Sequence, residues 1–188
     1  MNSVLRRKSG PGVALLLASI TSSLSAVAHA QPDSPFLLTA YVDAVGGERL
    51  IAGQYDTALV QIRSAAQTDT AKVVNKTNAC VALAVLKQLA QARKACDDAV
   101  TAASRDRLHS SGVVSKSRLD ENESVAIAYT NRAVVHSLSK EAVSSAEDLA
   151  EAYSLAPASE FVARNIAAFK ISRTVAAGLE VVSRRVAE

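Results

Sequence analysis

The sequence predicts an all-α fold, a short array of helical hairpins that ends in a capping helix. The first observation behind this prediction is the stretch 126–157, where small and apolar residues recur at the spacing of two amphipathic helices packed against each other. The second is that the same spacing returns elsewhere in the chain, which composition alone does not produce. We therefore expect one helical domain over residues 47–188. Its hairpins are predicted at about 47–67, 73–103 and 124–157.

The repetition is clearest in the first two hairpins. Four of their residues recur at a separation of 34 residues, namely Gln54 and Gln88, Ala58 and Ala92, Ile62 and Cys96, and Ala65 and Ala99. In the third hairpin Ser145 corresponds to Ala92, a separation of 53 residues, which is one repeat plus 19. The surplus matches a polar insertion at about 105–123. We expect this insertion to be a solvated loop whose acidic end caps the following helix, although long loops also often contact a partner.

These hairpins resemble the tetratricopeptide repeat, whose 34-residue pattern runs from an aromatic residue through two small residues to a large apolar residue and a closing proline. Within 126–157 those places are taken, in order, by Tyr129, Ala133, Ser145, Leu149 and Pro157. Arg132 and His136 depart from the pattern, because the family prefers a large apolar residue and a tyrosine there. The resemblance implies an α-solenoid that binds a protein or peptide partner in a concave groove lined by its leading helices.

Three asparagines share one place in the repeat. Asn131 and Asn165 are 34 residues apart, and Asn78 and Asn131 are 53 apart, the same separation as that between Ala92 and Ser145. The resemblance implies that an asparagine here either ties neighbouring repeats together or hydrogen-bonds the backbone or terminal carboxylate of a bound peptide; an amide suits both roles. Arg132 and Arg164 flank two of the asparagines and are candidates for pairing with an acidic peptide.

Residues 1–30 have the composition of a signal peptide. The basic run Arg6-Arg7-Lys8 precedes an apolar run over 13–27, and Ala28-His29-Ala30 supplies a small-residue cleavage site. A membrane anchor is the alternative, but serines and a threonine dilute the apolar run and no cysteine follows for lipidation. We predict cleavage after Ala30 and a periplasmic or secreted protein, with no stable membrane anchor after cleavage.

The balance of charge changes when this segment is removed. The chain has 21 basic and 18 acidic residues, and three of the basic residues lie in the predicted signal peptide. The remaining residues are therefore balanced in charge. This balance removes the global support for binding nucleic acid or an anionic membrane surface.

The segment 31–46 is expected to be flexible and extended before the first helix. Pro32 and Pro35 disfavour a helix, and residues 36–42 are compatible with a strand. A helix can begin only after Gly46-Gly47. At the other end of the chain, we expect two separate helices over about 159–172 and 175–186, the second acting as a polar cap.

The two cysteines are placed symmetrically in the second hairpin. Cys80 and Cys96 are each eight residues from Gln88, at the expected turn, so they should lie opposite each other on adjacent antiparallel helices. In an oxidising compartment this arrangement favours a disulfide, which contributes about 3 kcal/mol for a loop of this length. Two reduced, buried thiols are the alternative.

Motifs for catalysis or metal binding are weak in this sequence. Ser137 and Lys140 fit the S-x-x-K spacing of serine acyl-transfer enzymes, but the partner motifs are missing and the pair falls at an expected turn. His109 and His136 have no cysteine or carboxylate at ligand spacing, so we expect no metal and no cofactor. The sequence favours a periplasmic interaction scaffold or adaptor that is not an enzyme. The alternative is an exported enzyme, or a carrier of a small apolar ligand, with its site at the groove and loops.

Overall fold

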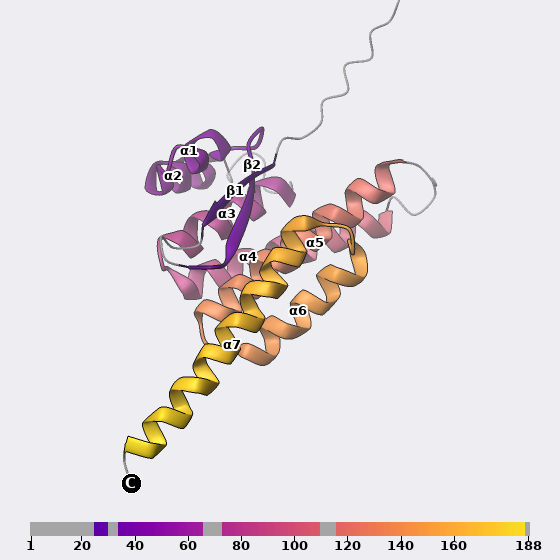
Figure 1. The fold of residues 1–188 in the computed structure, drawn as a ribbon. Helices are drawn as coiled ribbons and strands as arrows, with labels where there is room; N and C mark the ends of the chain where they lie inside the picture. The colour runs from indigo at the N-terminus through magenta and orange to yellow at the C-terminus, as the bar shows by residue number, and fades with distance from the viewer. Residues whose placement is uncertain (1–24, 30–33, 66–72, 110–115, 187–188) are drawn as a thin grey trace, which may run out of the picture.

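The computed structural model describes residues 25–29, 34–65, 73–109 and 116–186. In this part of the chain the protein is mostly helical, with seven helices and two short strands, as the all-α prediction requires. Figure 1 shows α1 and α2 at one end of the molecule, and α7 crossing the other helices and projecting past them at its carboxyl end.

Six of the helices form three hairpins. The hairpins are α1 (Gly47–Ile51) with α2 (Tyr55–Ala65), α3 (Val73–Val85) with α4 (Leu89–His109), and α5 (Lys116–Leu138) with α6 (Ala142–Leu155); α7 (Glu160–Val186) follows. Each helix contacts the next one along the chain, and the leading helices also contact one another in the order α1, α3, α5 and α7.

The turns of the three hairpins share one backbone geometry. Gly53, Lys87 and Lys140 are left-handed, with φ of 71°, 59° and 64°, and they are separated by the same 34 and 53 residues as the sequence repeat. After each of them, one backbone N–H donates to a carbonyl five residues earlier; the pairs are Gln54 to Arg49, Gln88 to Leu83 and Glu141 to His136, at 2.8–2.9 Å. This is the hydrogen bond of a Schellman helix end. The repetition read from the side chains is therefore present in the main chain as well.

The two strands form one antiparallel pair. Strand β1 (Ser25–His29) pairs with β2 (Leu37–Tyr41) in a register that sets Ser25 opposite Tyr41 and His29 opposite Leu37. All five residues of β2 are buried. Strand β2 contacts α1, α3, α5 and α7, so it touches all four leading helices.

Strand β2 is part of the main hydrophobic core. The core cluster includes Phe36, Leu38 and Ala40 together with Leu50 of α1, Leu59 of α2 and Val81 of α3. The turn after the strand depends on Gly47, because a side chain there would clash with the carbonyl oxygens of Tyr41 and Val42. The preceding Gly46 has a φ of 76°, which favours glycine. This pair of glycines lets α1 begin directly against the end of β2.

Three boundaries differ from those predicted. Residues 105–109 belong to α4 and residues 116–123 belong to α5, so these two parts of the predicted loop are helical. Its central residues, 110–115, lie outside the described residues. Asp120, Glu121 and Glu123 lie inside α5 and do not cap its start. Helix α7 is continuous, so the predicted break between two carboxyl-terminal helices is wrong. The cost of Gly178 in a helix, about 1 kcal/mol, does not end it.

Candidate functional site

The three asparagines of the repeat lie on successive leading helices and bind one extended segment. Asn78 belongs to α3, Asn131 to α5 and Asn165 to α7. Their Oδ1 atoms accept hydrogen bonds from the backbone N–H groups of β2, from Tyr41 at 2.8 Å, from Thr39 at 2.9 Å and from Leu37 at 3.0 Å. We call this set, Asn78, Asn131 and Asn165, the asparagine ladder.

Two members of the ladder bind both polar groups of a strand residue. The Nδ2 atom of Asn78 donates to the Tyr41 carbonyl oxygen at 2.8 Å, and the Nδ2 atom of Asn131 donates to the Thr39 carbonyl oxygen at 2.8 Å. Nδ2 of Asn165 instead donates to the Phe161 carbonyl oxygen of its own helix at 3.1 Å. A side-chain amide in this arrangement presents one acceptor and one donor to the strand, as a neighbouring strand would.

The asparagine ladder forms hydrogen bonds with backbone groups of the strand and not with its side chains. The bound residues are 37, 39 and 41, which alternate because successive residues of a strand direct their N–H and C=O groups to opposite edges. The side chains of Asn78, Asn131 and Asn165 are buried, with relative exposures of 0 %, 0 % and 1 %. The hydrogen bonds therefore form out of contact with water, where an unpaired amide would be costly.

Tyr41, at the end of β2, has a phenol whose pKa is raised. Burial raises the pKa of the Tyr41 phenol above its ordinary value of 10.0. The nearby Ser124 offsets part of this rise, and the negative charge of Glu123 adds to it. Burial of Tyr41 therefore favours the neutral form of its phenol.

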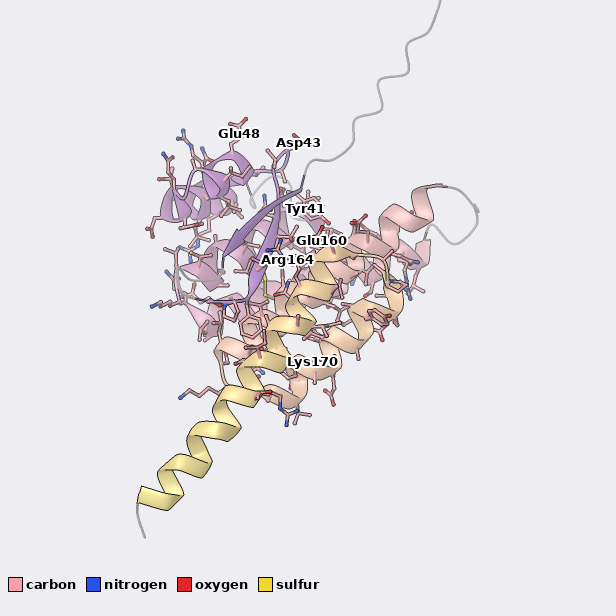
Figure 2. All side chains as sticks on the ribbon, viewed as in Figure 1. Tyr41, Asp43, Glu48, Glu160, Arg164 and Lys170 are labelled. Carbon is pink, nitrogen blue, oxygen red and sulfur yellow. A yellow bond between two sulfur atoms is a disulfide. The ribbon has the colours of Figure 1, made fainter. Side chains whose placement is uncertain are left out.

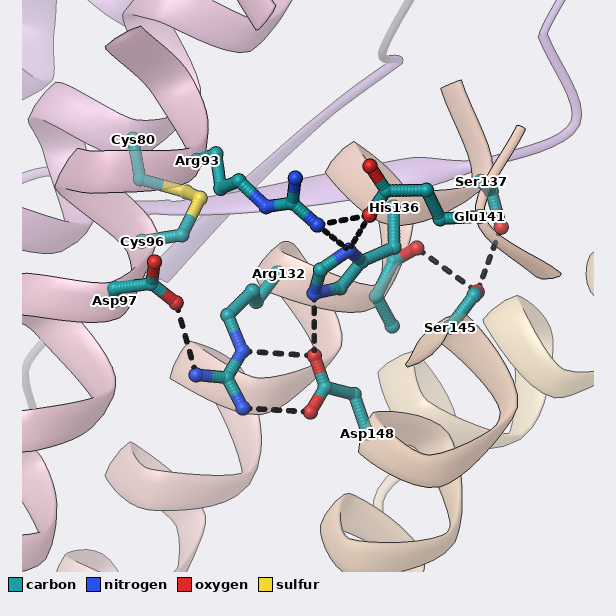
Figure 3. A network of polar contacts seen from close by, with 11 residues as sticks. Cys80, Arg93, Cys96, Asp97, Arg132, His136, Ser137, Glu141, Ser145 and Asp148 are labelled. Atoms are coloured by element: carbon teal, nitrogen blue, oxygen red, sulfur yellow. Dashed lines mark hydrogen bonds and ion pairs between the residues drawn. A yellow bond between two sulfur atoms is a disulfide. The ribbon is translucent and has the colours of Figure 1, made fainter. Parts of the chain in front are cut away.

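Arg132 faces away from the strand and pairs with acidic residues of two other helices. Its guanidinium contacts both carboxylate oxygens of Asp148 on α6, at 2.8 and 2.7 Å, and Asp97 of α4 at 3.0 Å. These pairs, which Figure 3 shows, raise the pKa of Arg132 above its ordinary value. Arg132 also lies over the Tyr129 ring, 5.2 Å from its centroid. It therefore joins α4, α5 and α6, and its charge is already neutralised by the protein.

His136, one turn after Arg132, continues this network. Its Nε2 lies 3.6 Å from Asp148, and its Nδ1 lies 2.7 Å from the Glu141 carboxylate. Arg93 of α4 pairs with the same carboxylate. The hydrogen bond with His136, together with the Arg93 charge, lowers the pKa of Glu141. The two residues that depart from the tetratricopeptide pattern are thus the two that α5 contributes to one polar network (Figure 3).

Arg164 lies close to the start of the strand. Its side chain is 60 % exposed and lies 3.9 Å from Glu160 of the same helix. Figure 2 shows both residues on α7, next to the strand. They line a surface hollow of about 340 Å³ together with Leu37, Glu123, Ser159 and Phe161. Of the two arginines proposed from the sequence, Arg164 is the one exposed beside the strand, where its long contact with Glu160 leaves it more accessible than Arg132.

Cys80 and Cys96 form a disulfide between α3 and α4, with an S–S distance of 2.07 Å. Both cysteines are buried and belong to the core cluster that contains Leu38 and Ala40 of β2. The bridge therefore closes the hairpin that carries the first member of the ladder.

The serine and lysine of the S-x-x-K spacing are engaged in the turn between α5 and α6. The Ser137 hydroxyl lies 2.7 Å from the Ser145 hydroxyl, which donates to the Ala133 carbonyl oxygen. Lys140 is the left-handed residue of that turn.

In the described ranges no group of three or more histidine, cysteine, aspartate or glutamate residues is placed to hold a metal ion. None of the helices described there has the length and apolar character needed to cross a bilayer.

No protein-family model, curated protein or solved structure matches this chain.

Sequence reasoning missed the charged network around Asp148. The sequence does contain an indication of this network, because Arg132 and His136 are four residues apart and so lie on one helix face. Asp148 is buried although it is charged, and a buried carboxylate is normally paired. The position of β2 in the ladder was also missed.

Proposed function

We propose that this chain is an exported interaction scaffold of the tetratricopeptide type, and that a protein or peptide partner binds beside β2, the strand that the buried asparagine ladder holds in place. The observation that carries the proposal is the ladder itself. Three amides on successive leading helices hold an extended main chain at alternating residues, which is a sequence-tolerant way to bind a peptide. The shared turn geometry and the contacts between leading helices support a solenoid arrangement.

Export is the second part of the proposal. The apolar run and small-residue cleavage site support it, and so does the disulfide, because such bonds persist in oxidising compartments. The processed protein begins at Gln31. Sequencing the amino terminus of protein recovered from the exported fraction tests this directly. Recovery of a membrane-retained protein that begins at Met1 would contradict both the localisation and the cleavage site.

A substitution at Arg164 can test whether a partner binds beside the strand. Arg164 is exposed next to Leu37 and can pair with an acidic group of a bound segment. We expect an Arg164→Glu variant to weaken the recovery of a crosslinked partner. Lys170→Glu is the matched control, because it reverses the same charge at an exposed position of the same helix.

The experiment uses the tagged processed protein, an extract of exported proteins from the source organism, crosslinking and quantitative mass spectrometry. A partner that the wild type and Lys170→Glu recover, and Arg164→Glu recovers poorly, supports the scaffold. The absence of any reproducible partner, together with measurable hydrolase turnover by the purified protein, would overturn it in favour of an exported enzyme.

A further inference from the structure

Strand β2 has two edges, and they are filled in different ways. One edge is filled by the asparagine ladder, which takes the polar groups of Leu37, Thr39 and Tyr41. The backbone groups of Leu38 and Ala40 therefore point to the other edge. That edge carries β1, which pairs antiparallel with all five residues of β2.

Strand β1 lies inside the segment that the sequence marks for removal. It spans Ser25–His29, and the predicted cleavage follows Ala30. Cleavage at that site removes β1 and leaves Leu38 and Ala40 of β2 with two N–H and two C=O groups on an uncovered edge. Unpaired groups on a strand edge are a template for pairing with another chain.

We propose that the exposed edge of β2 in the processed protein binds an extended segment of another exported protein, which adds to β2 as an antiparallel strand in the place of β1. This proposal rests on the proposed export and processing, and it specifies how the proposed scaffold holds its partner. The register of β1 defines the site: Ala28 lies opposite Leu38, and Ala26 lies opposite Ala40.

The chemistry of the partner segment can be inferred from β1, the strand that occupies this edge of β2 in the structure. The strand seated there reads Ser-Ala-Val-Ala-His, a run of small and β-branched residues with no acidic or basic group other than the histidine. Helix α1 contacts this strand as well. The partner segment is therefore a short, extended, uncharged run rich in alanine and valine, recognised mainly through its main chain.

A peptide with the sequence of residues 23–30 provides the probe. Its binding to the processed protein is measured by fluorescence anisotropy. Residues directly opposite Leu38 and Ala40 exchange backbone hydrogen bonds with them, so the N–H groups of Ala26 and Ala28 donate to β2. We expect N-methylation at Ala26 or Ala28 to weaken binding by at least about tenfold. N-methylation at Val27 is the matched control and should change the affinity less, because that N–H points away from β2.

The full chain provides a second control. Residues 1–188, retained in an oxidising cytoplasm so that the disulfide forms and the signal stays uncleaved, keep β1 on the edge. We expect this form to bind the labelled peptide at least about tenfold more weakly than the processed protein, because a tethered strand competes at a high effective concentration.

Three outcomes would overturn the proposal. The first is a processed protein that does not bind the unmethylated peptide. The second is equal loss of affinity from methylation at Val27 and at Ala28. The third is a processed protein that is dimeric by light scattering and loses the dimer on peptide addition, since a second copy would then be the occupant. Peptide binding without any partner in the extract would show an edge that accepts a strand but would contradict both the scaffold function and the proposed partner, whereas a reproducible partner without peptide binding would contradict the edge site alone, so the two failures are distinguishable.

Discussion

Thr39 and Asn131 exchange two hydrogen bonds across 92 residues of sequence. The Thr39 N–H donates to the Asn131 Oδ1 at 2.9 Å, and the Asn131 Nδ2 donates to the Thr39 carbonyl oxygen at 2.8 Å. Both residues are buried. The Asn131 amide, which was expected to join repeats or to bind a peptide, thus binds a segment of its own chain. In doing so it joins the strand to α5.

The Asn131→Ala substitution should destabilise the protein. It removes both hydrogen bonds and leaves the N–H and C=O of Thr39 buried without partners, which costs about 2–4 kcal/mol. Chemical denaturation of the purified protein measures this loss. Asn122→Ala, at a partly buried position of the same helix, is the control and should change the free energy of unfolding by under about 1 kcal/mol. Equal effects of the two substitutions would show that the ladder contributes little to stability.

Loss of the disulfide should also lower stability. The bridge between Cys80 and Cys96 closes a loop with a sequence separation of 16, and its removal is expected to cost about 2–4 kcal/mol. Thermal unfolding with and without a reductant measures the change. The double variant Cys80→Ala, Cys96→Ala should be insensitive to the reductant. If alkylation of the denatured, unreduced protein adds two labels by intact mass, the protein lacks the bridge.

The Asp148→Asn substitution should disrupt the network that joins α4, α5 and α6. The Asp148 side chain is 8 % exposed and that of Arg132 is 21 % exposed, so removal of the negative charge leaves a largely desolvated guanidinium with Asp97 as its remaining acidic partner. We expect a loss of about 2–3 kcal/mol in unfolding free energy. Asp98→Asn is the control, because Asp98 pairs with Lys94 at the surface, where such a pair contributes about 0–1 kcal/mol. Similar losses for the two variants would contradict the assignment.

Stability should fall in the alkaline range because of Tyr41. Burial holds the folded-state pKa of its phenol above 10.0, so the unfolded chain loses this proton first as the pH rises. The contribution of the neutral phenol is present below about pH 10 and is lost above it. Denaturation at several pH values should show a shallower alkaline decline for Tyr41→Phe than for the wild type. Tyr153→Phe, at an exposed position of α6, should leave the decline unchanged.

The helical fold could be predicted from the sequence because each hairpin buries one apolar face at a constant spacing. The alanines and the asparagines that keep this spacing are inward-facing residues, and packing limits what can stand there. Residues 105–109 and 116–123 carry polar residues and lack this apolar spacing, although they extend α4 and α5. A polar extension of a helix cannot be told from a loop by apolar periodicity. The same limit explains why the predicted insertion was too long.

The arrangement of the candidate site could be predicted only in part. The spacing of Asn78, Asn131 and Asn165 predicts that they lie at equivalent heights on successive helices, and in the structure they bind one strand. The identity of that strand could not be predicted, because an amide that binds main chain places little demand on the side chains of the bound segment. The sequence of residues 37–41 therefore carries no signal that points to the ladder.

The path of β2 across the leading helices has a consequence for the order of folding. Leu37, the first residue of β2, donates its backbone N–H to Asn165 of the last helix, 128 residues later. A chain that emerges amino terminus first, from a ribosome or through a translocation pore, cannot complete this contact until nearly the whole sequence has emerged. Until then the apolar residues of the strand can pack only against the earlier hairpins, through residues such as Leu50, Leu59 and Val81, and incompletely buried segments are prone to aggregate. We therefore expect the docking of α7 against β2 to be a late step of folding, because its contacts join residues far apart in the sequence.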